Sequence, residues 1–249
     1  MMNPRHLAAA AGGVLLALAV GAPLSPASAE SPTPDVLSQV GTYDSLTQPN
    51  FTGIAPLSSV LTDETLGLGT FNNLDGELVL VGGTVYQVRP DGTPRVADRS
   101  ATSPFLQAVH FRAERSGPVA PGTTCAQLIP AINALADSSD GVVAVRVRGT
   151  FTDLVTRSVT AVPPPFKPLS EVVATQTVFP LGATRAVLVG FRQGANALGV
   201  GQPGLHLHGV TAARTAGGHV LSCVAGPDVQ LSIQQVEEVR LRVPPRLAR

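Results

Sequence analysis

Residues 204–222, GLHLHGVTAARTAGGHVLS, contain two strand-like segments separated by a loop. In the first segment apolar residues alternate with His206 and His208, so both imidazoles project from one face of a strand. The loop 211–216 and two glycines then return the chain to His219. An antiparallel pairing of the two segments would bring the third imidazole to the first two.

The three clustered histidines form a candidate metal site. Three neutral imidazoles around one cation leave positions open for water or substrate, which is typical of catalytic rather than structural zinc. A lone H-x-H pair on a strand is more often a surface or core pair than a metal site, but a third histidine after a Gly-Gly turn reverses that balance. We therefore predict that His206, His208 and His219 bind Zn²⁺. His110, between two apolar residues, is interpreted as a packed strand residue.

A period of two continues through most of the chain from about residue 51. Segments 78–81 and 84–88 flank Gly82-Gly83, which predicts a tight hairpin. Valines at 143, 145 and 147 alternate with arginines at 146 and 148, which predicts a strand with one face in water. Further strands are expected at about 186–191, 204–211, 218–224, 228–233 and 236–243.

One helix is expected at about residues 124–136, where the apolar residues fall on one face after Thr124, which can cap the helix start. The pattern as a whole predicts a β-rich α+β fold. We expect mixed or antiparallel sheets in two closely associated subdomains, with the metal site between or beside them.

The composition excludes several classes of protein. A hydrophobic fraction of 44% with 14% charged residues excludes an intrinsically disordered chain. The chain has 17 basic and 17 acidic residues and no basic run, which argues against nucleic acid or an anionic membrane as a partner. The expected partner is a small molecule, and a homodimer stays open.

Residues 1–29 have the pattern of a signal peptide. Arg5 precedes an apolar stretch at 7–22, and Ala27-Ser28-Ala29 is a small-x-small cleavage site. The apolar stretch is shorter than the roughly 20 residues of a membrane span. We expect cleavage after Ala29 and a secreted or periplasmic protein, with residues 30–50 as a flexible arm and 51–249 as the folded domain.

Cys125 and Cys223 are the two cysteines of the chain. In an oxidising compartment an even pair predicts a single disulfide that closes a long loop. Two buried thiols are the alternative, because the sequence does not give the Cα separation that a disulfide requires.

Several motifs, in this order along the chain, resemble those of the alpha-acetolactate decarboxylase family. Residues 204–208 and 217–221 resemble its zinc-binding signature. The other matching segments are 67–77, 85–87, 102–105, 156–159 and 165–169. Together they extend from about residue 55 to 224, so the resemblance identifies 51–249 as a catalytic domain.

The resemblance implies a carboxy-lyase that converts 2-acetolactate to acetoin and CO2. Loss of CO2 leaves an electron pair to be held as an enediolate, for which Zn²⁺ would act as the electron sink. It further implies that Arg157 orients the substrate carboxylate, that Glu77 is an acid, proton donor or hydrogen-bond partner beside the metal, and that Thr70 is a secondary polar contact. No organic cofactor is implied.

The chain departs from the family at its end. The resemblance implies a further glutamate that a C-terminal extension returns to the metal site, whereas Glu237 and Glu238 match no such tail. Two other readings therefore stay open. One is a secreted metal-dependent hydrolase or oxygenase, and the other is a zinc-binding module whose catalysis is impaired.

Overall fold

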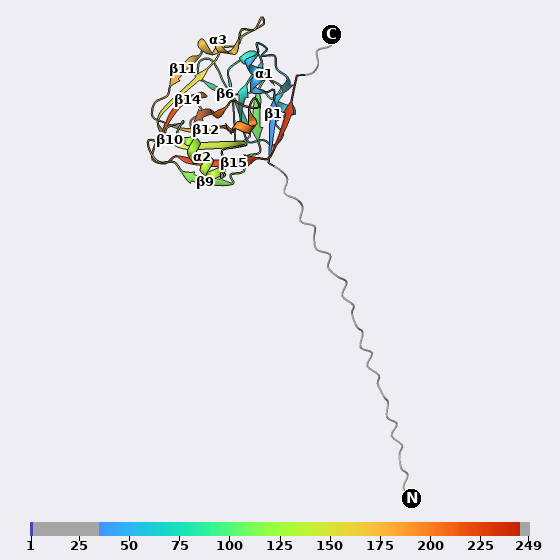
Figure 1. The fold of residues 1–249 in the computed structure, drawn as a ribbon, viewed down its shortest axis with the longest axis vertical. Helices are drawn as coiled ribbons and strands as arrows, with labels where there is room; N and C mark the ends of the chain where they lie inside the picture. Colours follow the sequence, from blue (N-terminus) through green and yellow to red (C-terminus); the bar gives the residue numbers. More distant parts are fainter. Residues whose placement is uncertain (2–34, 245–249) are drawn as a thin grey trace. The chain divides into compact units, whose positions relative to one another are not determined.

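The protein is described by a computed structural model that covers Met1 and residues 35–244. Apart from Met1, the expected signal peptide and its cleavage site lie outside the described residues. The described chain forms two seven-stranded sheets and one two-stranded sheet, with few helices (Figure 1). The predicted β-rich fold with mixed and antiparallel sheets is confirmed.

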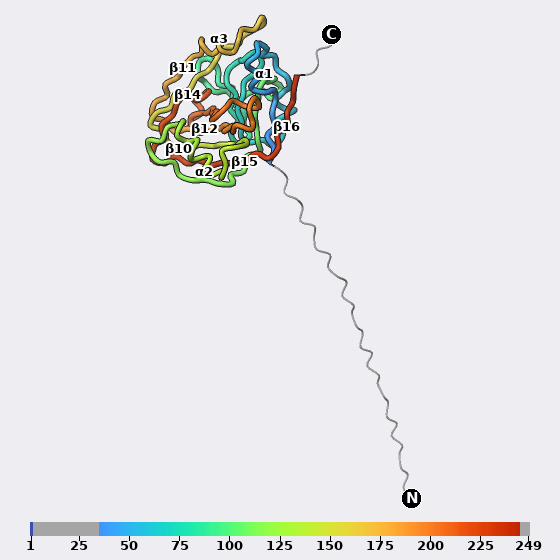
Figure 2. The backbone as a smooth tube through the Cα atoms, viewed as in Figure 1, coloured from blue at the N-terminus to red at the C-terminus, as the bar shows by residue number. Residues whose placement is uncertain are grey.

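The first sheet joins strands from both ends of the described chain. Its order is β16 (Glu238–Arg242), β1 (Val36–Val40), β8 (Leu106–Val109), β3 (Leu66–Thr70), β4 (Glu77–Val81), β5 (Thr84–Val88) and β6 (Pro94–Val96). β1 and β16 pair in parallel, and Figure 2 shows the blue β1 beside the red β16. All other neighbours are antiparallel, so the sheet is mixed.

The prediction of a flexible arm at residues 30–50 is wrong from residue 36 onward. β1 occupies Val36–Val40 between two other strands, and α1 follows at Tyr43–Thr47. Thr42 caps α1 in a capping box, as its hydroxyl accepts the N–H of the third helical residue. The segment is short and has no local apolar period, but pairing with β8 and β16 buries its few apolar side chains.

The second sheet is built around one long strand. Its path is β12 (Thr184–Gln193), β13 (Gly204–Thr211), β14 (Gly217–Ala225), β10 (Val142–Ser158), β15 (Gln230–Val236) and β9 (Arg115–Pro118), with β11 (Thr177–Pro180) beside β10. The first half of β10 pairs with β12 and the second half pairs with β14. Strands β10, β12, β13 and β14 therefore close into a ring.

The remaining elements are short. They are β2 (Ala55–Pro56), β7 (Thr102–Ser103), α2 (Leu128–Ala136), α3 (Leu169–Ala174) and three 3₁₀ turns, η1 (Leu57–Ser59), η2 (Asn72–Leu74) and η3 (Ala195–Ala197). The strand positions predicted from the alternating pattern agree with β4, β5 and β12 to β16, with ends shifted by a few residues, whereas β10 continues to Ser158, well beyond the predicted segment 143–148.

α2 starts later than the sequence predicts. The helix expected at 124–136 begins at Leu128, after Gln127. Thr124 does not cap it, because Thr124 lies in a turn and forms a bridge with Val224 of β14. Thr124 thus pairs with the sheet and residues 125–127 form a turn, so only the later residues of the predicted helix are helical and bury apolar side chains against the sheet.

Both sheets contribute to one apolar core. Leu66 and Leu68 of the first sheet belong to the same buried cluster as Ala144, Val189 and Phe191 of the second. A second cluster lies between the second sheet and α2, and a third lies against the first sheet. The described residues 35–244 group as one compact unit, so the two sheets share a core and are not separate subdomains.

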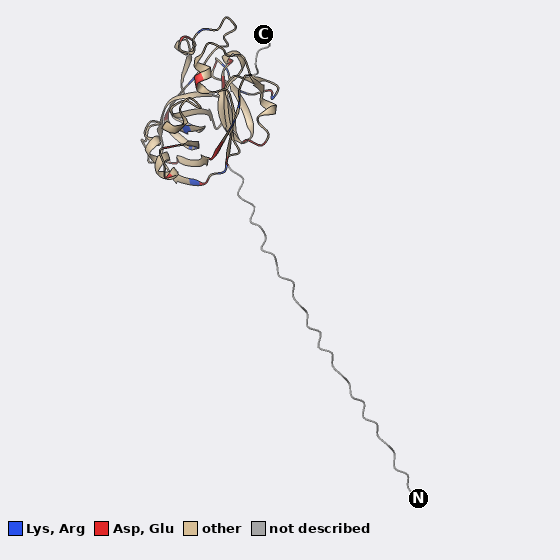
Figure 3. Cartoon of the chain, turned by 45° about the vertical axis from the view of Figure 1, so that its right-hand side comes forward, with Lys and Arg blue, Asp and Glu red and all other residues tan. Residues whose placement is uncertain are grey.

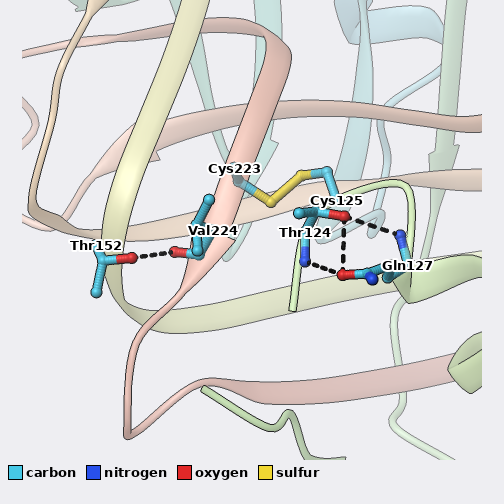
Figure 4. The surroundings of a disulfide bond; sticks show 6 residues. All are labelled: Thr124, Cys125, Gln127, Thr152, Cys223 and Val224. Carbon is cyan, nitrogen blue, oxygen red and sulfur yellow. Dashed lines mark hydrogen bonds between the residues drawn. A yellow bond between two sulfur atoms is a disulfide. The ribbon is translucent and has the colours of Figure 1, made fainter. Parts of the chain in front are cut away.

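Cys125 and Cys223 form a disulfide, with Cα atoms 5.1 Å apart, as the sequence predicted. Figure 4 shows the bond beside the turn of Thr124 and Gln127. It joins the segment before α2 to β14. The bond therefore fixes the turn that precedes α2 to β14, a strand of the ring.

Among the described residues, no helix is long and apolar enough to cross a membrane. Acidic and basic residues are scattered over the described fold, as Figure 3 shows. No described segment concentrates one sign of charge, which agrees with the composition.

Candidate metal centre and active site

The three histidines predicted to bind metal come together at the junction of β13 and β14. His206 and His208 share one face of β13, and His208 lies directly opposite His219 of β14. Nε2 of His206 is 3.2 Å from Nε2 of His208, and Nδ1 of His219 is 3.1 Å and 3.2 Å from these two atoms. Three ring nitrogens therefore converge on one point.

The ring nitrogens at this point are lone-pair donors. The Nδ1–H of His208 donates to the carbonyl oxygen of Leu78 at 2.8 Å, which leaves its Nε2 unprotonated when the ring is neutral. Burial lowers the pKa of His206 and of His219 well below 6.5 and that of His208 to about 3. Neutral imidazole is the form that binds a metal ion.

The arrangement fits a divalent metal ion. The nitrogen atoms are 3.1–3.2 Å apart, close to the separation of about 3.3 Å between two ligands bound tetrahedrally at 2.0–2.1 Å. Three imidazoles, without a fourth His, Cys, Asp or Glu in their group among the described residues, suit a site that keeps a position open for substrate. The candidate metal centre is therefore His206, His208 and His219.

Arg157 lies beside the histidines, in a row of residues that crosses three neighbouring strands of the second sheet. It is directly opposite His219 on β10, so β13, β14 and β10 place His208, His219 and Arg157 side by side. Gly218 makes this approach feasible, because its φ is +133° and a Cβ atom there would lie 2.3 Å from the carbonyl oxygen of Arg157. The Gly-Gly pair before His219 thus serves close strand packing as well as the turn.

Glu77 reaches the centre from the other sheet. It is the first residue of β4, only 5% of its side chain is exposed, and it forms an ion pair with Arg157. Its Oε2 is 3.4 Å from Nε2 of His208. Burial raises the pKa of Glu77, while the nearby charge and hydrogen bond of Arg157 oppose that rise. The carboxyl group therefore lies between the guanidinium and the metal-binding nitrogens.

Thr70 stands opposite Glu77 in the β3–β4 pair. Its Oγ1 donates to the carbonyl oxygen of Gly76 at 2.8 Å, and the residue is buried. Thr70 therefore holds the turn immediately before Glu77 and also lines the cavity of the site.

A cavity of about 270 Å³ opens onto these groups. Its polar lining includes every site residue predicted from the sequence: Thr70, Glu77, Arg157, His206, His208 and His219. Its apolar wall comes from both sheets, α1 and α3 and includes Leu46, Phe105, Val159, Leu169, Val173 and Leu221. The cavity is thus a mostly apolar chamber with its charged groups around the candidate metal centre.

The sequence analysis missed three polar residues of this lining, Tyr43, Gln176 and Gln202. Oε1 of Gln176 is buried and has no hydrogen-bond partner among the described residues. No local pattern marks these residues, since they come from α1, from the end of α3 and from the loop before β13. Their position follows from the tertiary fold alone.

His110 and the two late glutamates lie outside the centre. His110 follows β8 and is exposed, with Nδ1 2.8 Å from the carbonyl oxygen of Asp63. The prediction that His110 is a packed strand residue is therefore wrong. The metal-binding group among the described residues does not include it. Glu237 and Glu238 do not line the cavity, and Glu238 lies on the exposed edge strand β16.

Sequence comparison identifies the relatives of this chain. A sequence profile of the alpha-acetolactate decarboxylase family matches residues 37–248. An alpha-acetolactate decarboxylase of Methanosarcina mazei is 35% identical over 187 residues, which are 75% of this chain and 65% of that relative. The Bacillus subtilis (strain 168) relative of the same description is 34% identical over 206 residues, or 83% of this chain and 80% of its own length.

Solved structures agree with the sequence comparison. The crystal structure of alpha-acetolactate decarboxylase from Bacillus subtilis strain 168 matches with a TM-score of 0.80 and 33% identity, over 84% of this chain and 89% of that chain. A Staphylococcus aureus protein described as similar to alpha-acetolactate decarboxylase gives a TM-score of 0.80 at 27% identity, with the same shares covered. The chain therefore belongs to the alpha-acetolactate decarboxylase family, as its motifs predicted, and is an enzyme of the decarboxylase class.

Proposed function

We propose that this protein is an exported, zinc-dependent decarboxylase that converts 2-acetolactate to acetoin and CO2. The observation that carries the proposal is the convergence of three imidazole nitrogens within 3.2 Å of one another, beside a buried Glu77–Arg157 pair and in one cavity. Family membership supports the reaction.

Zinc bound by His206, His208 and His219 would supply a Lewis acid where negative charge develops as CO2 leaves. Arg157 binds and orients the substrate carboxylate. Its guanidinium has five N–H donors, so the ion pair with Glu77 leaves others that can face the cavity. A carboxylate held by a planar fork has its C1–C2 bond fixed in direction, which favours breaking that bond.

In this proposal Glu77 takes up a proton from solvent and then donates it, since the ion-paired carboxylate carries none. The reaction breaks the C1–C2 bond, and the electron pair left behind must take up one proton to give acetoin. Glu77 Oε2 is the carboxyl oxygen nearest to the histidine nitrogens among the described residues that line the cavity. Thr70 holds the turn before Glu77 and so fixes the direction of this group.

Export is supported by the signal-peptide pattern of residues 1–29 and by the disulfide, a bond that persists in oxidising compartments. We expect the mature chain to begin at Glu30. Intact-mass measurement of the protein recovered from outside the cytoplasm tests this, and a mass that retains residues 1–29 would contradict it.

Metal analysis of the purified mature protein, together with an acetoin assay on racemic 2-acetolactate, tests the proposal. We expect about one zinc per chain, loss of acetoin formation on chelation, and recovery on adding zinc. Zinc-loaded protein that forms no acetoin would contradict the proposed reaction and favour a non-catalytic metal-binding module. Activity that requires a redox-active metal and O2 would favour an oxygenase.

A further inference from the structure

Two arginines of β10 follow the residues by which this strand enters the shared core. Val142 and Ala144 project from β10 toward the first sheet and are buried in that core. Arg146 and Arg148 are the next residues on the same face. The water-facing side that the sequence predicts for this strand is therefore confined to Arg146, which is half-buried, and Arg148, which is exposed.

A second cavity, of about 210 Å³, occupies this position. We call it the arginine pocket; its lining is Thr65, Leu66, Val81, Gly82, Phe111, Arg146, Arg148, Val187 and Val189. It shares no residue with the cavity of the candidate metal centre. Its apolar lining comes from both sheets, and Val189 and Val187 of β12 pair directly with Arg146 and Arg148 of β10.

The two positive charges of the arginine pocket lack a counter-ion. No described carboxylate lies within 4.0 Å of Arg146 or Arg148. Nε of Arg146 is buried and has no hydrogen-bond partner among the described residues. The guanidinium carbon of Arg146 is 4.9 Å from the ring centre of Phe111, which fixes one of its faces.

These charges also act on each other. Burial and then the like charge of Arg148 lower the pKa of Arg146. An anion bound to the two guanidinium groups would offset this repulsion. Thr65 is placed to help, since its Oγ1 accepts the N–H of Phe111 and its hydroxyl hydrogen has no described acceptor.

We propose that the arginine pocket binds a small aliphatic carboxylate, whose oxygens accept from Arg146 and Arg148 and whose hydrocarbon part contacts Leu66, Val81 and Val187. The chemistry of the lining decides the class of ligand. Two guanidinium groups select an oxyanion, and the valine and leucine side chains select an apolar body over a fully hydrated ion.

Backbone amide NMR of the zinc-loaded protein, titrated with isobutyrate, tests the proposal. We expect saturable shifts at Thr65, Gly82 and Phe111, with a dissociation constant in about the millimolar range. In the double variant Arg146→Gln/Arg148→Gln, the dissociation constant obtained from these shifts should rise roughly tenfold or more. Arg95→Gln is the control, since it removes one exposed positive charge from β6 and should leave the shifts unchanged.

The amide shifts report on the arginine pocket, and the acetoin assay reports on the proposed catalytic site. The double variant should keep acetoin formation and the free energy of unfolding near those of the unchanged protein. Retention of both would show that the variant folds. Absence of acetoin formation by the unchanged protein would contradict the proposed function without affecting the amide shifts. Isobutyrate that shifts none of the three amides, equal shifts in the double variant, or binding of inorganic phosphate without binding of isobutyrate would each overturn the inference.

Discussion

Glu77 and Arg157 come from different sheets and form an ion pair beside His208. Exposed fractions of 5% for the Glu77 side chain and 14% for that of Arg157 show that the pair is largely withdrawn from water. A buried charge that loses its partner is costly, because neither water nor a second charge replaces the lost contact. The pair therefore connects the stability of the sheet junction with the geometry of the candidate active site.

Glu77 and Arg157 should be strongly coupled in a double-mutant cycle. We expect Glu77→Gln and Arg157→Gln, singly and together, to give an interaction free energy of about 1–3 kcal/mol by urea unfolding at fixed zinc concentration. The exposed pair Arg185–Asp228 is the control, and there the same cycle should give about 0–1 kcal/mol. Equal coupling in the two cycles would argue against a buried, structurally specific pair.

His208→Ala should abolish stoichiometric zinc binding. The substitution removes one of three converging nitrogens and also the hydrogen bond to the Leu78 carbonyl that orients the ring. Elemental analysis after dialysis measures the effect, with His110→Ala as the matched control because that exposed histidine lies outside the group. Full occupancy in the His208 variant would remove it from the ligand set.

Arg157→Lys should keep the metal but slow turnover. Lysine retains the charge and loses the planar fork that can hold both Glu77 and a substrate carboxylate. A lost contact of roughly 2–4 kcal/mol corresponds to a decrease on the order of 30- to 1,000-fold in kcat/KM. Acetoin assays at verified zinc occupancy measure it. A near-normal rate would exclude Arg157 from the reaction.

Removal of the disulfide should lower the free energy of unfolding by more than the loss of its local contacts alone. Cys125 and Cys223 are 98 residues apart, so the bond restricts a long loop in the unfolded chain. We expect Cys125→Ser/Cys223→Ser to lower the free energy of unfolding by about 2–5 kcal/mol, measured by urea unfolding. The untreated protein should show no free thiol under denaturing conditions, and two free thiols would contradict the bond.

Gly190→Ala should disturb the metal-binding strand. A Cβ atom at Gly190 would lie 1.9 Å from the carbonyl oxygen of His206, so β12 and β13 must move apart. We expect a loss of about 1–3 kcal/mol in the free energy of unfolding, together with weaker zinc binding. Gly117→Ala is the control because no atom lies within 4 Å of its Cβ position. Zinc binding and stability equal to those of the control would show that the strands adjust freely.

The sequence alone determined the parts of the site that are close together along the chain. The alternation at residues 205–208 and the Gly-Gly return to His219 predict three imidazoles on neighbouring strands, and the structure brings them together. The period of two suffices there because it fixes which side chains share a face. The hairpin at Gly82-Gly83 is confirmed for the same reason.

The roles of Glu77 and Arg157 required more than local pattern. A resemblance to family motifs singled them out, because a carboxylate after a turn and an arginine on a strand carry no local signal of function. Their ion pair depends on the packing of β4 against the ring of the second sheet. That contact joins residues 80 positions apart.

Only the tertiary structure decided which side of an alternating strand is buried, and where the first and last described strands pack. β1 has too few apolar residues for a local period, yet parallel pairing with β16 and antiparallel pairing with β8 bury it. On β10, Ala144 and Arg146 share a face, but only Ala144 belongs to the buried apolar cluster that both sheets form. Strand pairing and sheet packing join distant residues, so their outcome is a property of the whole fold and not of any local stretch of sequence.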